Sequence, residues 1–168
     1  MTQILYFGDS HPASTSAHRV HALERLGHTV SIHDPYLALA GKLGFPYLEP
    51  IHYRMGYRLL QLSMARWVKQ VLNTTGQPDA VWVNSGELFG IQCLASLKQL
   101  SCPIILYNND DPTGGRDGRR FDTLLKAIPY YNLCVVMREI NVPEYLALGA
   151  KQVLKVRMSY DEVMQKAF

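Results

Sequence analysis

The stretch that decides the fold is ILYFGDSHPASTSAHRVHALERLGHTVSIH, residues 4–33. It opens on a short apolar run, Ile4–Gly8, which predicts a strand. Apolar residues then recur every three positions, which predicts a helix over Thr15–Leu26, and Gly27 supplies its C-terminal stop. A second strand is predicted at Thr29–His33. A strand, a helix and a strand within thirty residues indicate a βαβ unit with parallel strands.

The same alternation continues along the chain. Further apolar runs predict strands at Asp79–Asn84, Pro103–Tyr107, Leu133–Met137 and Gln152–Val156. Helical periods lie between them at Leu88–Leu100, around Phe121–Ile128 and from Pro143 to Gly149. The runs are continuous rather than alternating, as in parallel strands that helices cover on both faces. We therefore predict one Rossmann-like α/β domain over residues 1–168, a doubly wound, mainly parallel six-stranded sheet in three αβα layers with strand order 2-1-3-4-5-6.

The interval between the second and third strands is less regular. Residues 35–50 are broken by prolines and glycines and read as a loop, whereas residues 51–76 read as one long helix. Arg54 and Arg58 each follow a tyrosine in this helix. Two interpretations stay open for them, a solvated basic face with packed tyrosines, or a patch for anionic lipid headgroups or a phosphorylated acceptor. The second would give the protein a peripheral membrane contact.

Composition narrows the class of protein. The chain has 168 residues, 48% of them hydrophobic and 18% charged, which suits one soluble globular domain with a substantial core. A net charge of +3 does not by itself argue for nucleic acid, and we expect no nucleic-acid partner. No apolar run approaches the roughly 20 residues of a membrane helix. The N-terminus lacks the basic start and the cleavage site of a signal peptide, and the cysteines (Cys93, Cys102, Cys134) form no CxxC pair, so we expect a cytoplasmic protein with reduced thiols.

The predicted strand order also predicts where a ligand binds. In an open parallel sheet, ligands bind beyond the carboxyl ends of the strands, where the strand order reverses. The reversal falls between the first and third strands, beside the polar loops GDSH (8–11), NSGE (84–87) and NNDD (108–111). We therefore expect Asp9, His11, Glu87 and Asp110 to lie around one cleft at this edge.

Three other chemistries fit the sequence poorly. The first turn has the single glycine Gly8 where dinucleotide binding needs G-x-G-x-x-G. A receiver-type phosphoacceptor needs acids at the strand ends, but the third strand ends in Asn84. Asp110 and Asp111 are adjacent, and adjacent side chains of an extended segment point in opposite directions, which makes a poor chelator. We therefore predict no metal site.

The segments quoted above, together with DAVWVNSGELFG (79–90), PIILYNNDDPTGG (103–115) and the terminal MSYDE (158–162), resemble the amino-terminal half of a GT-B glycosyltransferase. The resemblance is closest to the CgeB-like (spore-maturation-protein) group and covers essentially the whole chain, through the order and spacing of segments rather than through any one motif. It implies an acceptor-side domain whose partner domain binds a nucleotide-sugar donor. The chain ends about where such an enzyme crosses into the donor domain, so we expect that domain to be absent and the piece alone to be inactive.

The resemblance also implies roles for residues. An inverting transfer needs a base for the acceptor hydroxyl, and in this family that base often follows the first strand, where His11 and Asp9 stand. Glu87 is the second candidate, and a merely structural role for His11 at the first helix is the alternative. The predicted groups for a sugar or glycosylated acceptor are Ser10, Asn108, Asn109, Asp110, Asp111, Arg116 and Arg119.

Two functions from different classes stay open at this point. In the first, the chain is the acceptor-binding half of a glycosyltransferase and binds no cofactor itself. In the second, it is a stand-alone Rossmann-like module that binds a ligand or a protein without catalysis. Two roles likewise stay open for Arg116 and Arg119. They either bind a phosphate group bidentately or are solvated charges of the loop.

Overall fold

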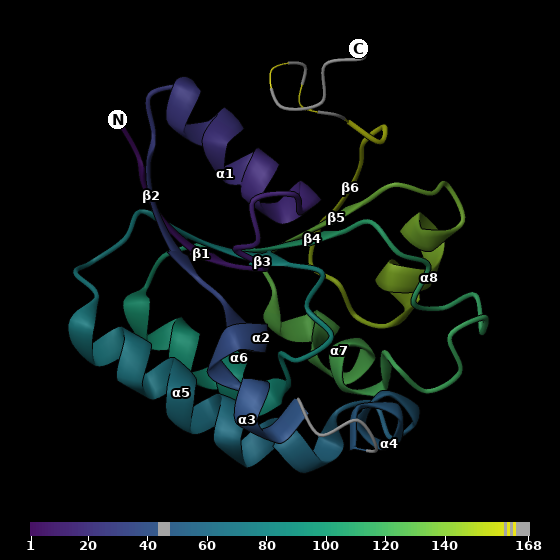
Figure 1. Ribbon diagram of the computed structural model, residues 1–168. Coiled ribbons are helices and arrows are strands. Elements are labelled where there is room, and N and C mark those ends of the chain that lie inside the picture. Colours follow the sequence, from purple (N-terminus) through teal and green to yellow (C-terminus); the bar gives the residue numbers. More distant parts are fainter. Residues whose placement is uncertain (44–47, 160, 162, 164–168) are drawn as a thin grey trace.

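The computed structural model describes residues 1–43, 48–159, 161 and 163. Six strands form one sheet in the order β2-β1-β3-β4-β5-β6, and every neighbouring pair is parallel (Figure 1). The strands are β1 (Gln3–Phe7), β2 (Thr29–His33), β3 (Ala80–Asn84), β4 (Ile104–Asn108), β5 (Leu133–Val136) and β6 (Val153–Lys155). The predicted fold class and strand order are therefore confirmed.

Helices cover both faces of the sheet. Helix α1 lies on one face, and α5, α6 and α7 lie on the other (Figure 1). The α-helices are α1 (Thr15–Arg25), α2 (Pro35–Ala38), α3 (Ala40–Leu43), α4 (Leu48–Arg54), α5 (Gln61–Thr74), α6 (Ile91–Leu97), α7 (Asp122–Ala127) and α8 (Asn141–Ala147). Short 3₁₀ turns follow at η1 (Arg58–Leu60), η2 (Lys98–Leu100) and η3 (Ile128–Tyr130).

The strands contribute side chains to two apolar cores, because successive side chains of a strand point to opposite faces of the sheet. Leu5 and Phe7 of β1 point into the larger core, which α5 to α8 complete. Ile4 and Tyr6 of the same strand join Val20 of α1 in a smaller core on the opposite face. The larger core therefore anchors the helices beneath the sheet, and α1 alone supplies a buried helical side chain to the smaller cluster among the described residues.

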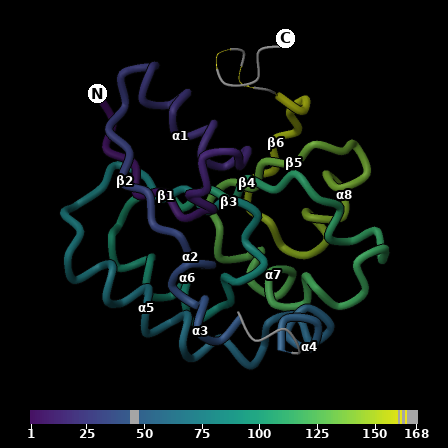
Figure 2. The backbone as a smooth tube through the Cα atoms, in the orientation of Figure 1, coloured from purple at the N-terminus to yellow at the C-terminus, as the bar shows by residue number. Residues whose placement is uncertain are grey.

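The single long helix predicted over residues 51–76 is wrong. The chain breaks at Gly56 and Tyr57, which adopt left-handed φ angles of 61° and 56°, and α4 and α5 run in different directions (Figure 2). A Cβ at residue 56 would lie 2.5 Å from the backbone oxygen of Arg119. Glycine is therefore required where the chain passes the start of α7, a contact that helical periodicity does not reveal.

Two other boundaries differ from the prediction. The region expected to be a loop contains α2 and α3, of which α2 is capped by Asp34 with Pro35 in its first turn, while residues 44–47 lie outside the described part. Helix α6 begins at Ile91 rather than at Leu88, because residues 85–90 first make a tight turn. The first difference adds two short helices after β2, and the second lengthens the loop after β3.

No helix within the described residues is long and apolar enough to cross a membrane. The three cysteines are free thiols in the structure. Burial raises the pKa of Cys93 and of Cys134 to about 12, which makes both thiols poor nucleophiles near neutral pH. Their role is therefore packing.

Candidate functional site at the carboxyl edge of the sheet

The parallel register brings the polar loops to one edge. Phe7, the last residue of β1, pairs with His33 of β2 and Val83 of β3, and Asn84 of β3 pairs with Tyr107 of β4. The loops that follow these strands therefore leave the sheet side by side. The residues predicted for the site from the first, third and fourth strands all follow these strand ends.

Internal hydrogen bonds hold the loop after β1. Asp9 Oδ1 accepts from the backbone N–H of His11 at 2.8 Å, and Ser14 Oγ donates to the backbone oxygen of Asp9 at 3.0 Å. Ser14 also caps α1 by accepting from the N–H of Ala17. The ring of His11 is exposed, and its Nδ1 accepts from the N–H of Ala13 at 3.2 Å. The neutral ring in this arrangement carries its proton on Nε2, so Nε2 presents a donor rather than a lone pair to a ligand.

A pocket of about 510 Å³ lies between this loop and the start of α2. The carboxylate of Asp34 joins the two, because Oδ2 accepts from the N–H and Oγ of Ser10 and Oδ1 accepts from the N–H groups of Tyr36 and Leu37. Sequence reasoning missed Asp34 as a site residue, although an Asp-Pro pair after a strand is a helix-start signal. The pocket is lined by Asp9, Ser10, His11, Pro12, Asp34, Tyr36 and Leu37.

Glu87 is buried next to this pocket. Its side chain is 2% exposed, and Oε1 accepts from the hydroxyl of Tyr36 and from Arg120 Nη2, both at 2.8 Å. Its Oε2 is also buried and has no hydrogen-bond partner among the residues that the structure describes. Burial, followed by the charge of Glu87, raises the pKa of Tyr36 well above its ordinary value and that of Tyr57 to about 12. Glu87 therefore anchors a tyrosine and an arginine, and solvent does not reach its carboxylate.

A strained turn places Glu87 there. Ser85 and Gly86 both adopt left-handed φ angles, 64° and 79°. A Cβ at residue 86 would lie 2.6 Å from Leu106 Cδ1 and 3.0 Å from Leu124 Cδ1. Position 86 thus needs glycine both for its backbone angle and for the close approach of the core.

We expect Gly86→Ala to destabilise the protein by about 2 kcal/mol, because it combines left-handed strain with overpacking. Gly115 is the matched control, since its φ is 71° and nothing lies within 4 Å of a Cβ built there. Urea unfolding of both variants measures the difference. Equal losses for the two alanine variants would show that packing around position 86 contributes nothing.

Arg120 connects Glu87 to Asp110. The arginine packs over the ring of Phe121 at 4.7 Å, and its Nη1 lies 3.9 Å from Asp110 Oδ2. Burial acts to lower the pKa of Arg120, but the charge and the hydrogen bond of Glu87, together with the charge of Asp110, outweigh it and the pKa is raised. Sequence reasoning chose Arg116 and Arg119 and missed Arg120, for which the sequence holds no signal beyond its place in the same basic run.

Asp110 keeps an accessible carboxyl at this edge. Its side chain is 37% exposed. Partial burial raises the pKa of Asp110, the positive charge of Arg120 opposes this, and Glu87 adds to it. Asp110 does not line the pocket beside the first loop, but a carboxyl with a raised pKa at this edge of the sheet can take up a proton more readily than an ordinary aspartate.

Two other predicted residues serve the loops themselves. Asn108 is fully buried, donates through Nδ2 to the backbone oxygen of Ser85 at 2.7 Å and accepts through Oδ1 from the N–H of Asp110 at 2.7 Å. Asp111 accepts from Asn141 Nδ2 at 2.8 Å and from Arg138 Nη1 at 3.3 Å. Asn108 ties the loop after β4 to the one after β3, and Asp111 ties it to the start of α8. The two acids of NNDD therefore have different partners.

The remaining predicted residues are more exposed. Asn109 is half-buried, and Arg116 is exposed in the long loop before α7. Arg119 is also exposed, and its Nε donates to Asp122 Oδ2 at 2.9 Å, a carboxylate that Arg58 also contacts. Unlike these two exposed arginines, Arg120 is half-buried and pairs with the buried Glu87, and phosphate binding by Arg116 and Arg119 stays a prediction.

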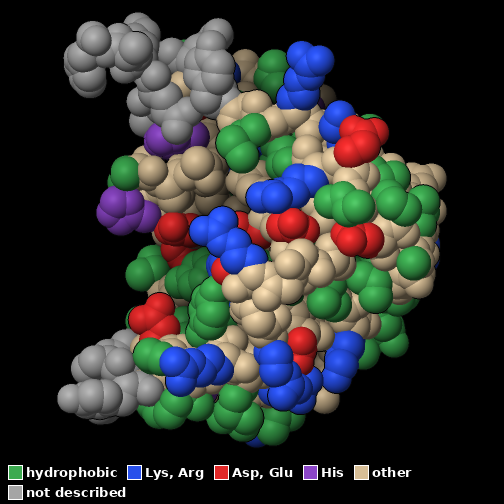
Figure 3. Space-filling view, turned by 90° about the vertical axis from the view of Figure 1, so that its right-hand side faces the viewer, with side chains coloured by type: hydrophobic (Ala, Val, Ile, Leu, Met, Phe, Trp, Pro, Cys, Tyr) green, Lys and Arg blue, Asp and Glu red, His purple; other side chains and the backbone are tan. Residues whose placement is uncertain are grey.

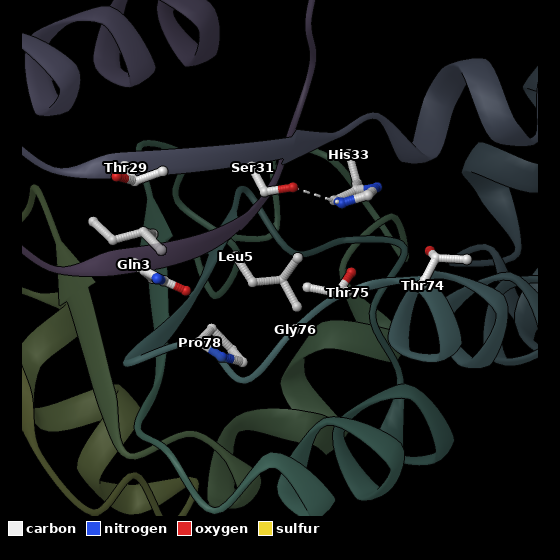
Figure 4. A pocket seen from close by; sticks show the side chains of 10 residues that line it. Gln3, Leu5, Thr29, Ser31, His33, Thr74, Thr75, Gly76 and Pro78 are labelled. Carbon is white, nitrogen blue, oxygen red and sulfur yellow. Dashed lines mark hydrogen bonds between the residues drawn. The ribbon is translucent and has the colours of Figure 1, made fainter.

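A second pocket, of about 250 Å³, lies beside the edge strand β2 (Figure 4). Alternate side chains of β2 point into it, and Ser31 Oγ lies 3.1 Å from His33 Nε2. Burial lowers the pKa of His33. The opposite wall is formed by Thr74, Thr75, Gly76 and Pro78, after the end of α5. This pocket contains none of the residues predicted for the site.

Comparison with known proteins identifies the fold. No protein-family model matches the chain, and no curated protein matches it. Among solved structures, an E. coli structure described as trehalose-6-phosphate bound with UDP-2-fluoro glucose is similar, with a TM-score of 0.54 and 14% identity over 88% of this chain and 42% of that one. UGT73P12 of Glycyrrhiza uralensis, complexed with glycyrrhetinic acid 3-O-monoglucuronide, has a TM-score of 0.53 and 9% identity over 97% of this chain and 49% of that one.

These similarities establish the fold alone. The chain has the Rossmann-like α/β fold found in these GT-B glycosyltransferases, and it spans less than half the length of each. The relation to the CgeB-like group stays a prediction.

Proposed function

We propose that the chain is the acceptor-binding domain of a glycosyltransferase of the CgeB-like group, acting in the cytoplasm together with a domain that binds a nucleotide-sugar donor. The observation that carries the proposal is Asp110, an accessible carboxyl with a raised pKa at the carboxyl edge of a glycosyltransferase-like fold. Both similar structures were solved with a sugar compound, which supports a sugar-related function for this fold.

The pocket beside the first loop would receive the acceptor. It presents Asp9, the ring of His11 and the hydroxyl of Ser10, groups that hydrogen-bond polyols well. Because Nδ1 of His11 accepts from Ala13, Nε2–H would donate to an acceptor oxygen. In this proposal His11 binds the acceptor, and the pocket itself supplies the specificity.

Asp110 would take the proton from the acceptor hydroxyl. The buried Glu87 is held by Tyr36 and Arg120, so it would position Arg120 next to Asp110 rather than act as the base itself. His11 is the alternative base, and for that role it would have to release the N–H of Ala13 or change tautomer.

This division of roles predicts the size of the acceptor. Strands β1 and β4 are separated by β3, so their carboxyl ends stand about 10 Å apart at the usual spacing between strands. An acceptor held at His11 and deprotonated at Asp110 must span that distance. A disaccharide or a glycosylated molecule fits better than one free hexose.

NMR titration of the ¹⁵N-labelled chain with cellobiose, maltose and lactose tests the proposal. We expect saturable shifts of the backbone amides of residues 9–11 and 109–111 with at least one disaccharide, and none there with glycerol or UDP-glucose. His11→Ala should weaken the binding, whereas His21→Ala, at an exposed histidine of α1, should not. Shifts at other surfaces only, or none with any sugar, would favour a stand-alone binding module instead.

A further inference from the structure

Four apolar side chains stand exposed where α4 leads into α5. Ile51 is 46% exposed, Met55 39%, Leu59 60% and Leu62 62%. They lie within twelve residues of chain, on turns of helix that bury other side chains against the large core. Scattered exposed leucines are ordinary, but these four form two close pairs, because Ile51 and Met55 are four residues apart and Leu59 and Leu62 are three apart.

Cations accompany this surface. Residues 48–78 carry Arg54, Arg58, Arg66 and Lys69, all exposed, and one acid, Glu49. The surplus of three positive charges equals the net charge of +3 of the whole chain, so the remaining residues are balanced. Arg58 pairs with Asp122 at 2.6 Å, whereas Arg54, Arg66 and Lys69 have no ion pair among the described residues.

The two kinds of side chain share a surface. Leu59, Leu62, Arg66 and Lys69 follow one another at intervals of three or four residues, which places them on one side of η1 and α5. Met64 and Val68, on the other side of α5, are fully buried. Figure 3 shows hydrophobic side chains along the lower end of the molecule with a row of Lys and Arg beside them.

We infer that this apolar–basic surface, formed by Leu59 and Leu62 with Arg66 and Lys69, docks the protein on an anionic lipid membrane. Interfacial segments combine apolar side chains, which enter the headgroup boundary, with flanking cations, which pair with lipid phosphates. The segment of residues 48–78 contains one acid, Glu49. Anionic headgroups would therefore neutralise the exposed cations of this surface. The inference is independent of glycosyl transfer, because none of these four residues lines the candidate site.

Flotation of the protein with vesicles tests the inference. We expect the protein to float with vesicles made of equal parts phosphatidylcholine and phosphatidylglycerol and to stay unbound with phosphatidylcholine alone. Arg66→Gln/Lys69→Gln should weaken binding to the anionic vesicles roughly 30-fold, because each cation at an anionic surface contributes about 1 kcal/mol. Leu59→Ser/Leu62→Ser should abolish binding, although it changes no charge.

Two controls keep the test decisive. Leu26→Ser removes a leucine that is 74% exposed at the end of α1, and it should leave vesicle binding unchanged. Circular dichroism establishes that each variant is folded. Failure to float with anionic vesicles, or equal loss in Leu26→Ser, overturns the inference. So does a dimer in solution that Leu59→Ser/Leu62→Ser dissociates, or binding of inorganic phosphate that needs the two cations but not the leucines.

Discussion

Arg120→Met is expected to destabilise the protein by about 3 kcal/mol, because it leaves the carboxylate of Glu87 buried without its cation. Methionine fills most of the space of the arginine stem, so the loss reports the missing charge rather than a cavity. The hydroxyl of Tyr36 would remain the one hydrogen-bond donor that the described structure gives to Glu87 Oε1. The midpoint of urea unfolding at neutral pH measures the effect.

Two further variants separate the buried charge from other causes. Glu87→Gln/Arg120→Met removes both charges and keeps an acceptor for Tyr36, so it should regain most of the lost stability. Arg119→Met removes the neighbouring arginine, which is 61% exposed, and should change the free energy of unfolding by less than about 1 kcal/mol. A loss in Arg120→Met no larger than in Arg119→Met would contradict a structural role for the buried pair.

The sheet could be predicted from the sequence because each strand is indicated by residues that are adjacent in the chain. Each strand is a short apolar run between polar loops, and every predicted strand end lies within one residue of the observed end. The strand order followed from the long irregular interval between β2 and β3. The break at Gly56 could not be predicted, because its cause is the backbone of Arg119, more than sixty residues away.

The same limit applies to the candidate site. Strand ends predicted which loops meet, since parallel strands deliver their carboxyl ends to one edge. Which side chains face the cleft depends on tertiary partners. Asn108 and Asp111 stand in the predicted loop but bond to neighbouring loops, whereas Arg120, one residue after Arg119, turns inward to Glu87. Polar residues at a strand end thus predict a location better than they predict a role.

Asp110→Asn should make the protein slightly more stable at neutral pH. The raised pKa means that folded Asp110 holds its proton more tightly than the unfolded chain does, so ionisation costs stability as pH rises through that pKa. Asparagine removes this cost, and the gain should be below about 1 kcal/mol because solvent screens the side chain. The gain should shrink as the pH is lowered toward 4, which urea unfolding at several pH values measures.

The same substitution should lower glycosyl transfer by roughly 10²–10⁴-fold, the usual contribution of a general base, in a protein that includes the donor-binding domain. In the unsubstituted enzyme, the rate should fall as pH falls through the pKa of Asp110, which lies above the ordinary value of 3.8.

His11→Gln should raise KM more than it lowers kcat, since its proposed role is to bind the acceptor. The opposite result, with Asp110→Asn active and kcat lost in His11→Gln, would assign the base to His11. We therefore expect Asp110→Asn to be more stable but inactive. This combination is typical of an active site whose catalytic charge lowers the stability of the fold.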